Sequence, residues 1–133
     1  SEIDKPVTVL VFWDINCGHC KKEMPIISRM YDSMTNEHFE IYAVYTQGDW
    51  AGWKKRLAKD KFNFINVANA FGEDKFRDKY NIRSTPQVLI LDKDKNIRFK
   101  KIGAKDIAKT VLYLLEEQGI VEPEEKEEEE KKE

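Results

Sequence analysis

An almost uninterrupted run of apolar residues lies near the start of the sequence, and similar runs recur later in the chain. Residues 7–13 (VTVLVFW) are β-branched or aromatic nearly throughout, which predicts a central strand buried on both faces and covered by helices on each side. Residues 40–45 and 87–91 predict two further strands. Residues 97–102 follow a polar turn at 92–96 and are expected to complete a hairpin.

Between these runs, apolar residues recur at the three- and four-residue steps that are typical of helices. This spacing predicts helices over residues 18–34, 50–60 and 104–118, and a shorter helix over 74–80. Residues 62–67 are ambiguous and fit a short extended segment. The side chains expected on the apolar helix faces are Met24, Ile27, Met30, Tyr31, Met34, Trp50, Trp53, Leu57, Ile107, Val111, Leu114 and Leu115.

Individual residues refine the helix predictions. Pro25 lies inside the first helix, where it removes a backbone donor and is expected to bend the helix. Trp50 and Trp53 share one helical face, which indicates packing into the core more often than a surface for clients. Gly119 is expected to end the last helix as its C-cap.

The order β-α-β-α-(α)-β-β-α predicts an α/β fold with a central mixed sheet of about four strands flanked by helices. Residues 1–121 are expected to form one domain, since this length can bury a single core. Residues 122–133 carry eight Glu and three Lys and contain no apolar residue to bury, so we expect an acidic, disordered tail.

Composition excludes several classes of protein. Charged residues make up 36% of the chain and hydrophobic ones 41%, as in soluble globular proteins. No apolar run is long enough for a membrane helix, and the N-terminus has no signal-peptide pattern. Removing the tail's charge of −5 from the formal −2 leaves +3 on residues 1–121, which is too weak to indicate nucleic-acid binding.

The two cysteines of the chain form a Cys-x-x-Cys pair where the first strand gives way to the first helix. A helix N-terminus offers unpaired N–H groups and the positive end of the helix dipole, and both favour a thiolate. Cys17 is therefore predicted to be the reactive sulfur, with a pKa lowered from about 8.5. Cys20 lies one turn further into the helix, is more shielded, and suits the resolving role.

Other interpretations of this pair are weaker. A structural zinc site needs four ligands, and beyond the cysteines the chain offers only His19 and His38, so no metal site is predicted. An inert disulfide across a four-residue loop would stabilise the fold only weakly. A histidine between the cysteines can stabilise the thiolate, so His19 is interpreted as tuning the redox pair.

Distant motifs strengthen the redox interpretation. Val-Phe-Trp precedes the pair, residues 17–25 read CGHCKKEMP, and Ser84-Thr85-Pro86-Gln87 follows far downstream. With these motifs, the chain from about residue 5 to 120 resembles the thioredoxin superfamily, and more narrowly the bacterial TlpA/ResA-like thiol–disulfide oxidoreductases. The resemblance implies a thioredoxin-like fold that lacks the N-terminal βα segment usual in such domains.

The resemblance also implies roles for single residues. Cys17 matches the attacking nucleophile and Cys20 the buried resolving thiol. Trp13 matches the tryptophan beside the active site, and Thr85-Pro86 matches the cis-proline loop that aligns the substrate backbone. These three residues are therefore the expected substrate-binding positions.

Departures from the family pattern bear on proton transfer and redox direction. Thioredoxins carry a buried acid six residues before the first cysteine, where this chain has Val11. Glu23, three residues after Cys20, matches a glutamate of ResA-like proteins and is expected to relay the Cys20 proton. The Gly18-His19 dipeptide resembles that of protein disulfide isomerases, so both residues are expected to tune the redox potential.

The leading hypothesis is a thiol–disulfide oxidoreductase that exchanges disulfides with protein substrates and needs no cofactor beyond the Cys17–Cys20 disulfide. The resemblance implies a periplasmic or cell-envelope location and a membrane-bound electron donor as a partner, without membrane insertion of this chain. The alternatives are a thioredoxin-fold binding module whose disulfide is structural or vestigial, and a peroxidase-type thiol enzyme.

Overall fold

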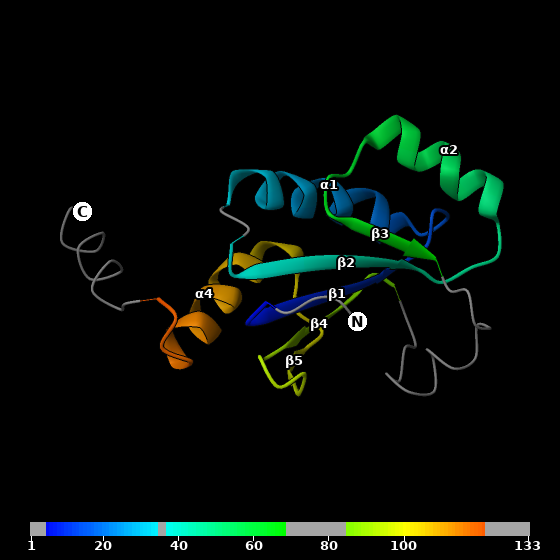
Figure 1. Ribbon diagram of the computed structural model, residues 1–133. Helices are drawn as coiled ribbons and strands as arrows, with labels where there is room; N and C mark the ends of the chain where they lie inside the picture. Colours follow the sequence, from blue (N-terminus) through cyan, green and yellow to red (C-terminus); the bar gives the residue numbers. More distant parts are fainter. Residues whose placement is uncertain (1–4, 35–36, 69–84, 122–133) are drawn as a thin grey trace.

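A five-stranded mixed sheet is the centre of the computed structural model, which describes residues 5–34, 37–68 and 85–121 (Figure 1). The strands lie side by side in the order β3-β2-β1-β4-β5. Strand β1 is therefore central, as its apolar run predicts. The strands are β1 (Val7–Trp13), β2 (Phe39–Tyr45), β3 (Ile65–Ala68), β4 (Gln87–Leu91) and β5 (Ile97–Lys100).

Strand directions divide the sheet into two halves. Strands β1, β2 and β3 run parallel, whereas β4 is antiparallel to both β1 and β5. The ambiguous segment 62–67 thus contributes a fifth strand, which begins at Ile65 and pairs with β2. Strand β5 is two residues shorter than predicted, because Lys101 has a φ of 56°, outside the extended region.

The helices agree with the predicted ones except at their ends. They are α1 (Gly18–Ser33), α2 (Trp50–Asp60), the 3₁₀ turn η1 (Ala104–Asp106) and α4 (Ile107–Glu117). Helix α1 contains Pro25, and the predicted last helix is divided into η1 and α4. Gly119 follows the capping residue of α4 and has a φ of 75°, which glycine adopts without strain. The helix predicted over 74–80 lies outside the described residues.

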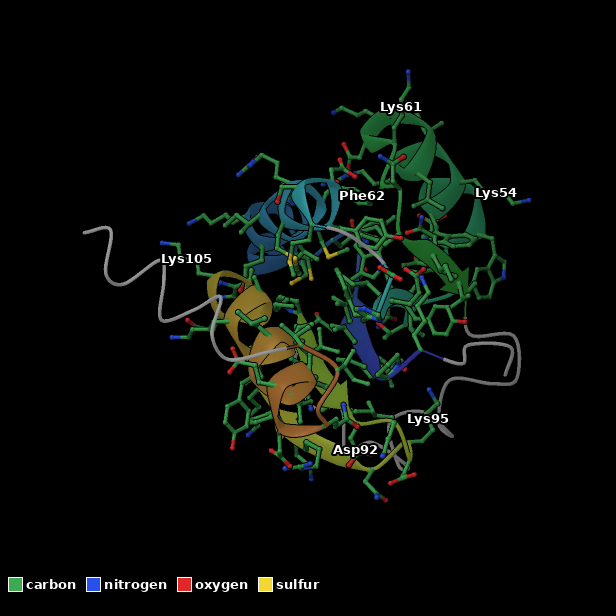
Figure 2. The ribbon with its side chains drawn as sticks, turned by 60° about the vertical axis from the view of Figure 1, so that its left-hand side comes forward. Lys54, Lys61, Phe62, Asp92, Lys95 and Lys105 are labelled. Atoms are coloured by element: carbon green, nitrogen blue, oxygen red, sulfur yellow. The ribbon has the colours of Figure 1, made fainter. Side chains whose placement is uncertain are left out.

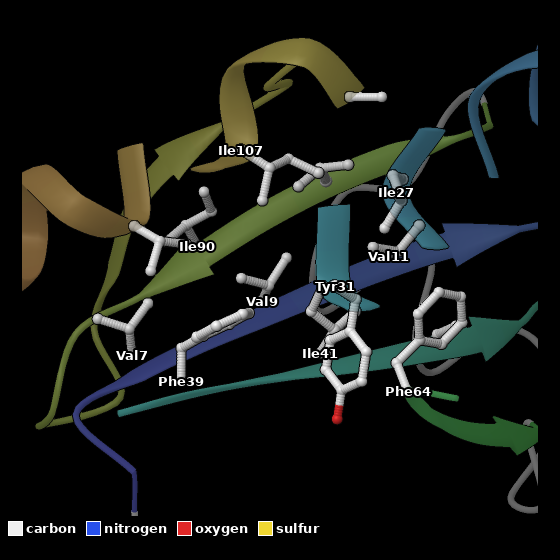
Figure 3. Packing of buried hydrophobic residues seen from close by; sticks show 14 of the residues in the cluster. Val7, Val9, Val11, Ile27, Tyr31, Phe39, Ile41, Phe64, Ile90 and Ile107 are labelled. Atoms are coloured by element: carbon white, nitrogen blue, oxygen red, sulfur yellow. The ribbon is translucent and has the colours of Figure 1, made fainter. Parts of the chain in front are cut away.

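Helices α1 and α4 pack together on one face of the sheet. Figure 3 shows Ile27 and Tyr31 of α1 and Ile107 near the start of α4 meeting Val9 and Val11 of β1. The apolar residues predicted for α4 are all buried in this cluster. The opposite face carries a smaller cluster of Phe12, Val44, Leu89 and Leu91, to which none of the described helices contributes a residue. The prediction of helices on each side of β1 is therefore confirmed for one face only.

Helix α2 covers the sheet less completely than α1 does. Trp53 and Leu57 are half-buried and pack against the main cluster. Trp50 is 43% exposed, so the prediction that both tryptophans pack into the core is wrong for Trp50. The ring of Trp50 packs edge-on against the ring of Tyr45, with centroids 5.9 Å apart.

A tight connection carries the chain from β1 into α1. The carbonyl oxygen of Trp13 accepts hydrogen bonds from the backbone N–H and the hydroxyl of Thr46, both at 3.1 Å. Asp14 then closes the turn, because its carboxylate accepts the N–H of Asn16 and its carbonyl oxygen accepts the N–H of Cys17. These hydrogen bonds tie the end of β1 to Thr46, which follows β2, and they fix the position of Cys17 at the start of α1.

Candidate active site

Cys17 is the N-cap residue of α1 and lies partly exposed at the carboxyl end of β1. Its sulfur accepts a hydrogen bond from the backbone N–H of Cys20 at 3.1 Å. The sulfur takes the place that a serine or aspartate oxygen occupies in an ordinary N-cap. This local geometry is the one that the sequence predicts.

The surroundings of Cys17 favour the thiolate. Burial raises the pKa of the Cys17 thiol, but hydrogen bonds with the Cys20 and Thr85 side chains and with the backbone N–H groups of Cys20 and His19 outweigh it. The pKa therefore lies below its ordinary value. A sulfur that is partly exposed and ionises readily is suited to nucleophilic attack.

Cys20 has the opposite character. The side chain is 1% exposed and belongs to the main apolar cluster. Burial raises the pKa of the Cys20 thiol most, and the hydrogen bond and negative charge of Cys17 raise it further, to about 12. Both cysteines are free, so the structure represents the dithiol.

Thr85 and Pro86 approach the cysteines from the far end of the sequence. The Cys17 thiol donates a hydrogen bond to the Thr85 carbonyl oxygen at 3.1 Å, across a separation of 68 residues. The Thr85–Pro86 peptide bond is cis, and both residues are half-buried. Strand β4 begins directly afterwards and pairs antiparallel with β1, which brings this loop to the cysteine end of β1.

Trp13 lies beneath the site and does not line its surface. Its side chain is 1% exposed and packs against Tyr45 and Phe62, with ring centroids 6.2 and 6.0 Å away. The structure therefore shows a packing role for Trp13, and its substrate-binding role stays a prediction.

Glu23 makes a contact that the sequence does not suggest. Its carboxylate accepts a hydrogen bond from the backbone N–H of Ala104 at 3.3 Å, which joins α1 to the start of η1. In the part of the chain that the structure describes, Glu23 is hydrogen-bonded to neither cysteine sulfur. The structure thus gives Glu23 a contact that positions η1, and its proton-relay role stays a prediction.

Gly18 and His19 are both exposed between the two cysteines. The backbone N–H of His19 contributes to lowering the pKa of the Cys17 thiol. This is the effect that the sequence predicts for N–H groups at a helix N-terminus, and the expected influence of the His19 side chain stays a prediction. Among the described residues, no three His, Cys, Asp or Glu side chains are grouped so that they could hold a metal ion.

Sequence reasoning missed a group of cations beside the motif. A hollow of about 270 Å³, here called the α1–α2 groove, lies next to the cysteine loop. The Lys-Lys-Arg run at 54–56 shows in the sequence that cations are clustered on this helix. The run does not indicate that these cations lie close to Cys17. The groove is lined by Ile15, Asn16, Lys21, Gly52, Lys55, Arg56 and Lys59.

None of the helices that the structure describes is long and apolar enough to cross a membrane.

Comparisons with known proteins agree with this geometry. A family described as thioredoxin-like matches residues 5–97. A thioredoxin-like protein of Haemophilus influenzae is 31% identical over 93 residues, which are 69% of this chain and 52% of that protein. The chain thus spans about half the length of this curated relative.

Solved structures extend the likeness to the whole described fold. A domain of a possible thiol-disulfide isomerase from Cytophaga hutchinsonii is 26% identical with a TM-score of 0.77, covering 90% of this chain and 82% of that one. A secreted disulfide oxidoreductase of Mycobacterium tuberculosis, 21% identical with a TM-score of 0.68, covers 82% of each chain and shares the fold. With a partly exposed and a buried cysteine beside a cis-proline, and with a family match over most of its length, the chain belongs to the thioredoxin-like family.

Proposed function

We propose that the protein is a thiol–disulfide oxidoreductase that exchanges disulfides with protein substrates through Cys17 and Cys20. The observation that carries the proposal is the contrast between the two thiols. The pKa of Cys17 lies below its ordinary value at a partly exposed position, whereas burial raises the pKa of Cys20 to about 12. One thiol is thus prepared to attack, and the other is kept protonated until it is needed.

In the reducing direction, the Cys17 thiolate attacks one sulfur of a substrate disulfide. A Cys17–substrate disulfide forms, and the other substrate sulfur leaves as a thiolate. Cys20 then loses its proton and attacks the Cys17 sulfur, which forms the Cys17–Cys20 disulfide and releases the second substrate thiolate. Two electrons pass from the protein dithiol to the substrate, and the two protons lost by the cysteines end on the substrate thiols.

The second step requires the pKa of Cys20 to fall, and the first step causes part of this decrease. The charge and hydrogen bond of Cys17 are among the causes that raise the pKa of Cys20. Once Cys17 is in the mixed disulfide, its sulfur no longer carries a negative charge, and this cause disappears. Glu23, one helical turn after Cys20, is the carboxylate proposed to accept the proton.

Substrate alignment is assigned to the loop that faces Cys17. Thr85 and Pro86 are half-buried beside the nucleophile, so an extended substrate segment can lie along them. Gly18 and His19 are exposed between the cysteines and are proposed to tune the potential of the pair. No cofactor beyond the cysteine pair enters the proposed reaction.

Partners and compartment follow from the family resemblance. We expect protein thiols and disulfides as substrates and a membrane-bound dithiol donor that reduces the pair again. A periplasmic or cell-envelope location fits these partners, and the fold is shared with a secreted oxidoreductase of Mycobacterium tuberculosis.

Insulin reduction in the presence of dithiothreitol tests the proposal. The wild-type protein is expected to accelerate precipitation of the insulin B chain, and Cys17→Ser to abolish the acceleration. Cys20→Ser is expected to accumulate a mixed disulfide that mass spectrometry detects, because the resolving thiol is missing. Equal rates for the wild type and Cys17→Ser would exclude the proposed function.

A further inference from the structure

The α1–α2 groove concentrates positive charge beside the nucleophile. Four of its lining side chains are cationic: Lys21 from α1, and Lys55, Arg56 and Lys59 from α2. Within the described part of the chain, no carboxylate side chain is among the residues that line it. Asn16, directly before Cys17 in the sequence, forms another part of the lining. A ligand in this groove would therefore contact Asn16, the residue directly before Cys17.

Most of this charge has no partner within the described fold. Arg56 is paired with Asp60 on the same helix. Among the described residues, no ion pair joins Lys21, Lys55 or Lys59 to a carboxylate. Lys54 and Lys61 point outward from α2 in Figure 2 and add to the positive field of this helix without lining the groove. Such a concave basic surface attracts anionic segments of other molecules.

The groove is held in place relative to Cys17 by close packing. A Cβ atom at Gly52 would lie 2.8 Å from the Cδ1 atom of Ile15 and 2.4 Å from a carboxylate oxygen of Asp49. Asp49 is engaged as the cap of α2, because its carboxylate accepts the N–H of Gly52 at 3.0 Å. Glycine at this position thus lets α2 approach the cysteine loop directly, so the cations and the nucleophile form one surface.

We propose that the α1–α2 groove binds an acidic segment of the protein substrate and so selects disulfides that are flanked by Asp or Glu. The inference rests on the proposed function, since the groove acts by delivering a disulfide to Cys17. Lys21, Lys55 and Lys59 bind the carboxylates, while the exchange itself proceeds through Cys17 and Cys20 as described above.

The acidic tail of this chain is a poorer occupant than a separate substrate. Gln118 donates a hydrogen bond to the Pro6 carbonyl oxygen at 3.2 Å, so the end of α4 lies at the amino end of β1. The cysteines follow the carboxyl end of the same strand, about 20 Å away for a strand of this length. The described chain thus ends, at Val121, near the amino end of β1, whereas the groove lies beyond its carboxyl end.

The test compares two peptides that contain the same disulfide between two cysteines. One peptide has Glu at the flanking positions and the other has Gln. The reduced protein is mixed with each peptide, and single-turnover reduction is followed by quenching and mass spectrometry. At low ionic strength we expect the acidic peptide to react about tenfold faster, and the advantage to disappear at about 1 M salt.

Reversing the charge of two lysines in the groove then tests whether the groove causes the preference for the acidic peptide. In Lys55→Glu/Lys59→Glu, the ratio of the two rates is expected to fall to about one or below. The matched control is Lys93→Glu/Lys100→Glu, which changes the net charge equally at exposed positions outside the groove and should keep the wild-type ratio. Circular dichroism of both variants checks that they fold.

The outcomes separate the two proposals. Reduction of both peptides at equal rates by the wild type would overturn the groove proposal and leave the proposed function standing. Reduction of neither peptide would overturn both. If replacing the glutamates at 127–130 with Gln accelerates reduction of the acidic peptide, the tail competes for the groove, and the assignment to a separate substrate is overturned.

Discussion

The sulfur of Cys17 lies 3.1 Å from the carbonyl oxygen of Thr85, a residue 68 positions later in the sequence. This contact brings the cis Thr85–Pro86 peptide against the one thiol whose surroundings favour ionisation. The contact joins the end of β1 to the start of β4, so the loop proposed to align the substrate lies directly beside the sulfur proposed to attack it.

The ionisation of Cys17 can be measured by alkylation. Because hydrogen bonds stabilise the thiolate, the rate of reaction with iodoacetamide should rise with pH around a midpoint below the ordinary thiol pKa of about 8.5. Cys20→Ser restricts the measurement to Cys17. The same variant unfolded in urea is the control, and an equal or higher midpoint in the folded protein would contradict the prediction.

The buried thiol of Cys20 should make the dithiol protein less stable at high pH. The folded protein holds this proton up to a pKa of about 12, whereas the unfolded chain releases it near 8.5. The stabilising effect is therefore complete below about pH 8.5, and it is lost as the pH rises towards 12.

Chemical denaturation in a reducing buffer at pH 7, 9 and 10.5 provides the measurement. Tyrosines and lysines also titrate in this range, so the wild type is compared with Cys20→Ala at each pH. The difference between their free energies of unfolding should shrink as the pH rises. A difference that stays constant would show that Cys20 is not held protonated.

The two tryptophans Trp13 and Trp50 should differ sharply in their effect on stability. Trp13→Ala removes a fully buried ring and is expected to cost about 3–5 kcal/mol of unfolding free energy. Trp50→Ala removes a ring that is 43% exposed and should cost about 1 kcal/mol. Urea denaturation compares them, and similar losses would contradict the packing role of Trp13.

Glu23 is predicted to have two separable roles. Glu23→Gln keeps an oxygen that can accept the Ala104 N–H, so stability should stay close to that of the wild type, whereas Glu23→Ala should lose about 1 kcal/mol. If the carboxylate accepts the Cys20 proton, Glu23→Gln should also slow resolution of the mixed disulfide, by about 100-fold.

The lifetime of a preformed Cys17 mixed disulfide, followed by stopped-flow tryptophan fluorescence, measures this step. Lys22→Gln is the control, because Lys22 is an exposed neighbour on the same helix. An unchanged lifetime in Glu23→Gln would limit Glu23 to its structural contact with η1.

Elements with a strong local pattern were predicted almost to the residue. The apolar run of β1 agrees with the structure because this strand is buried on both faces. The helical spacing of α1 and α2 agrees because apolar residues of each helix pack against the main cluster. For strand β3 the sequence predicts only an ambiguous extended segment at 62–67, and the structure confirms the extended conformation from Ile65 onward. Its extended conformation depends on hydrogen bonds to β2, a neighbour that the local sequence does not reveal.

The sequence by itself determined the α/β order of elements, the central strand and the different characters of Cys17 and Cys20. These are local properties, since a helix N-terminus and its first turn follow from neighbouring residues. Only the tertiary structure decided that Thr85 meets Cys17, that Glu23 contacts Ala104, and that the cations of α2 lie beside the nucleophile. Each of these depends on segments far apart in the chain, which strand pairing and side-chain packing bring together. Local sequence periodicity does not reveal such contacts.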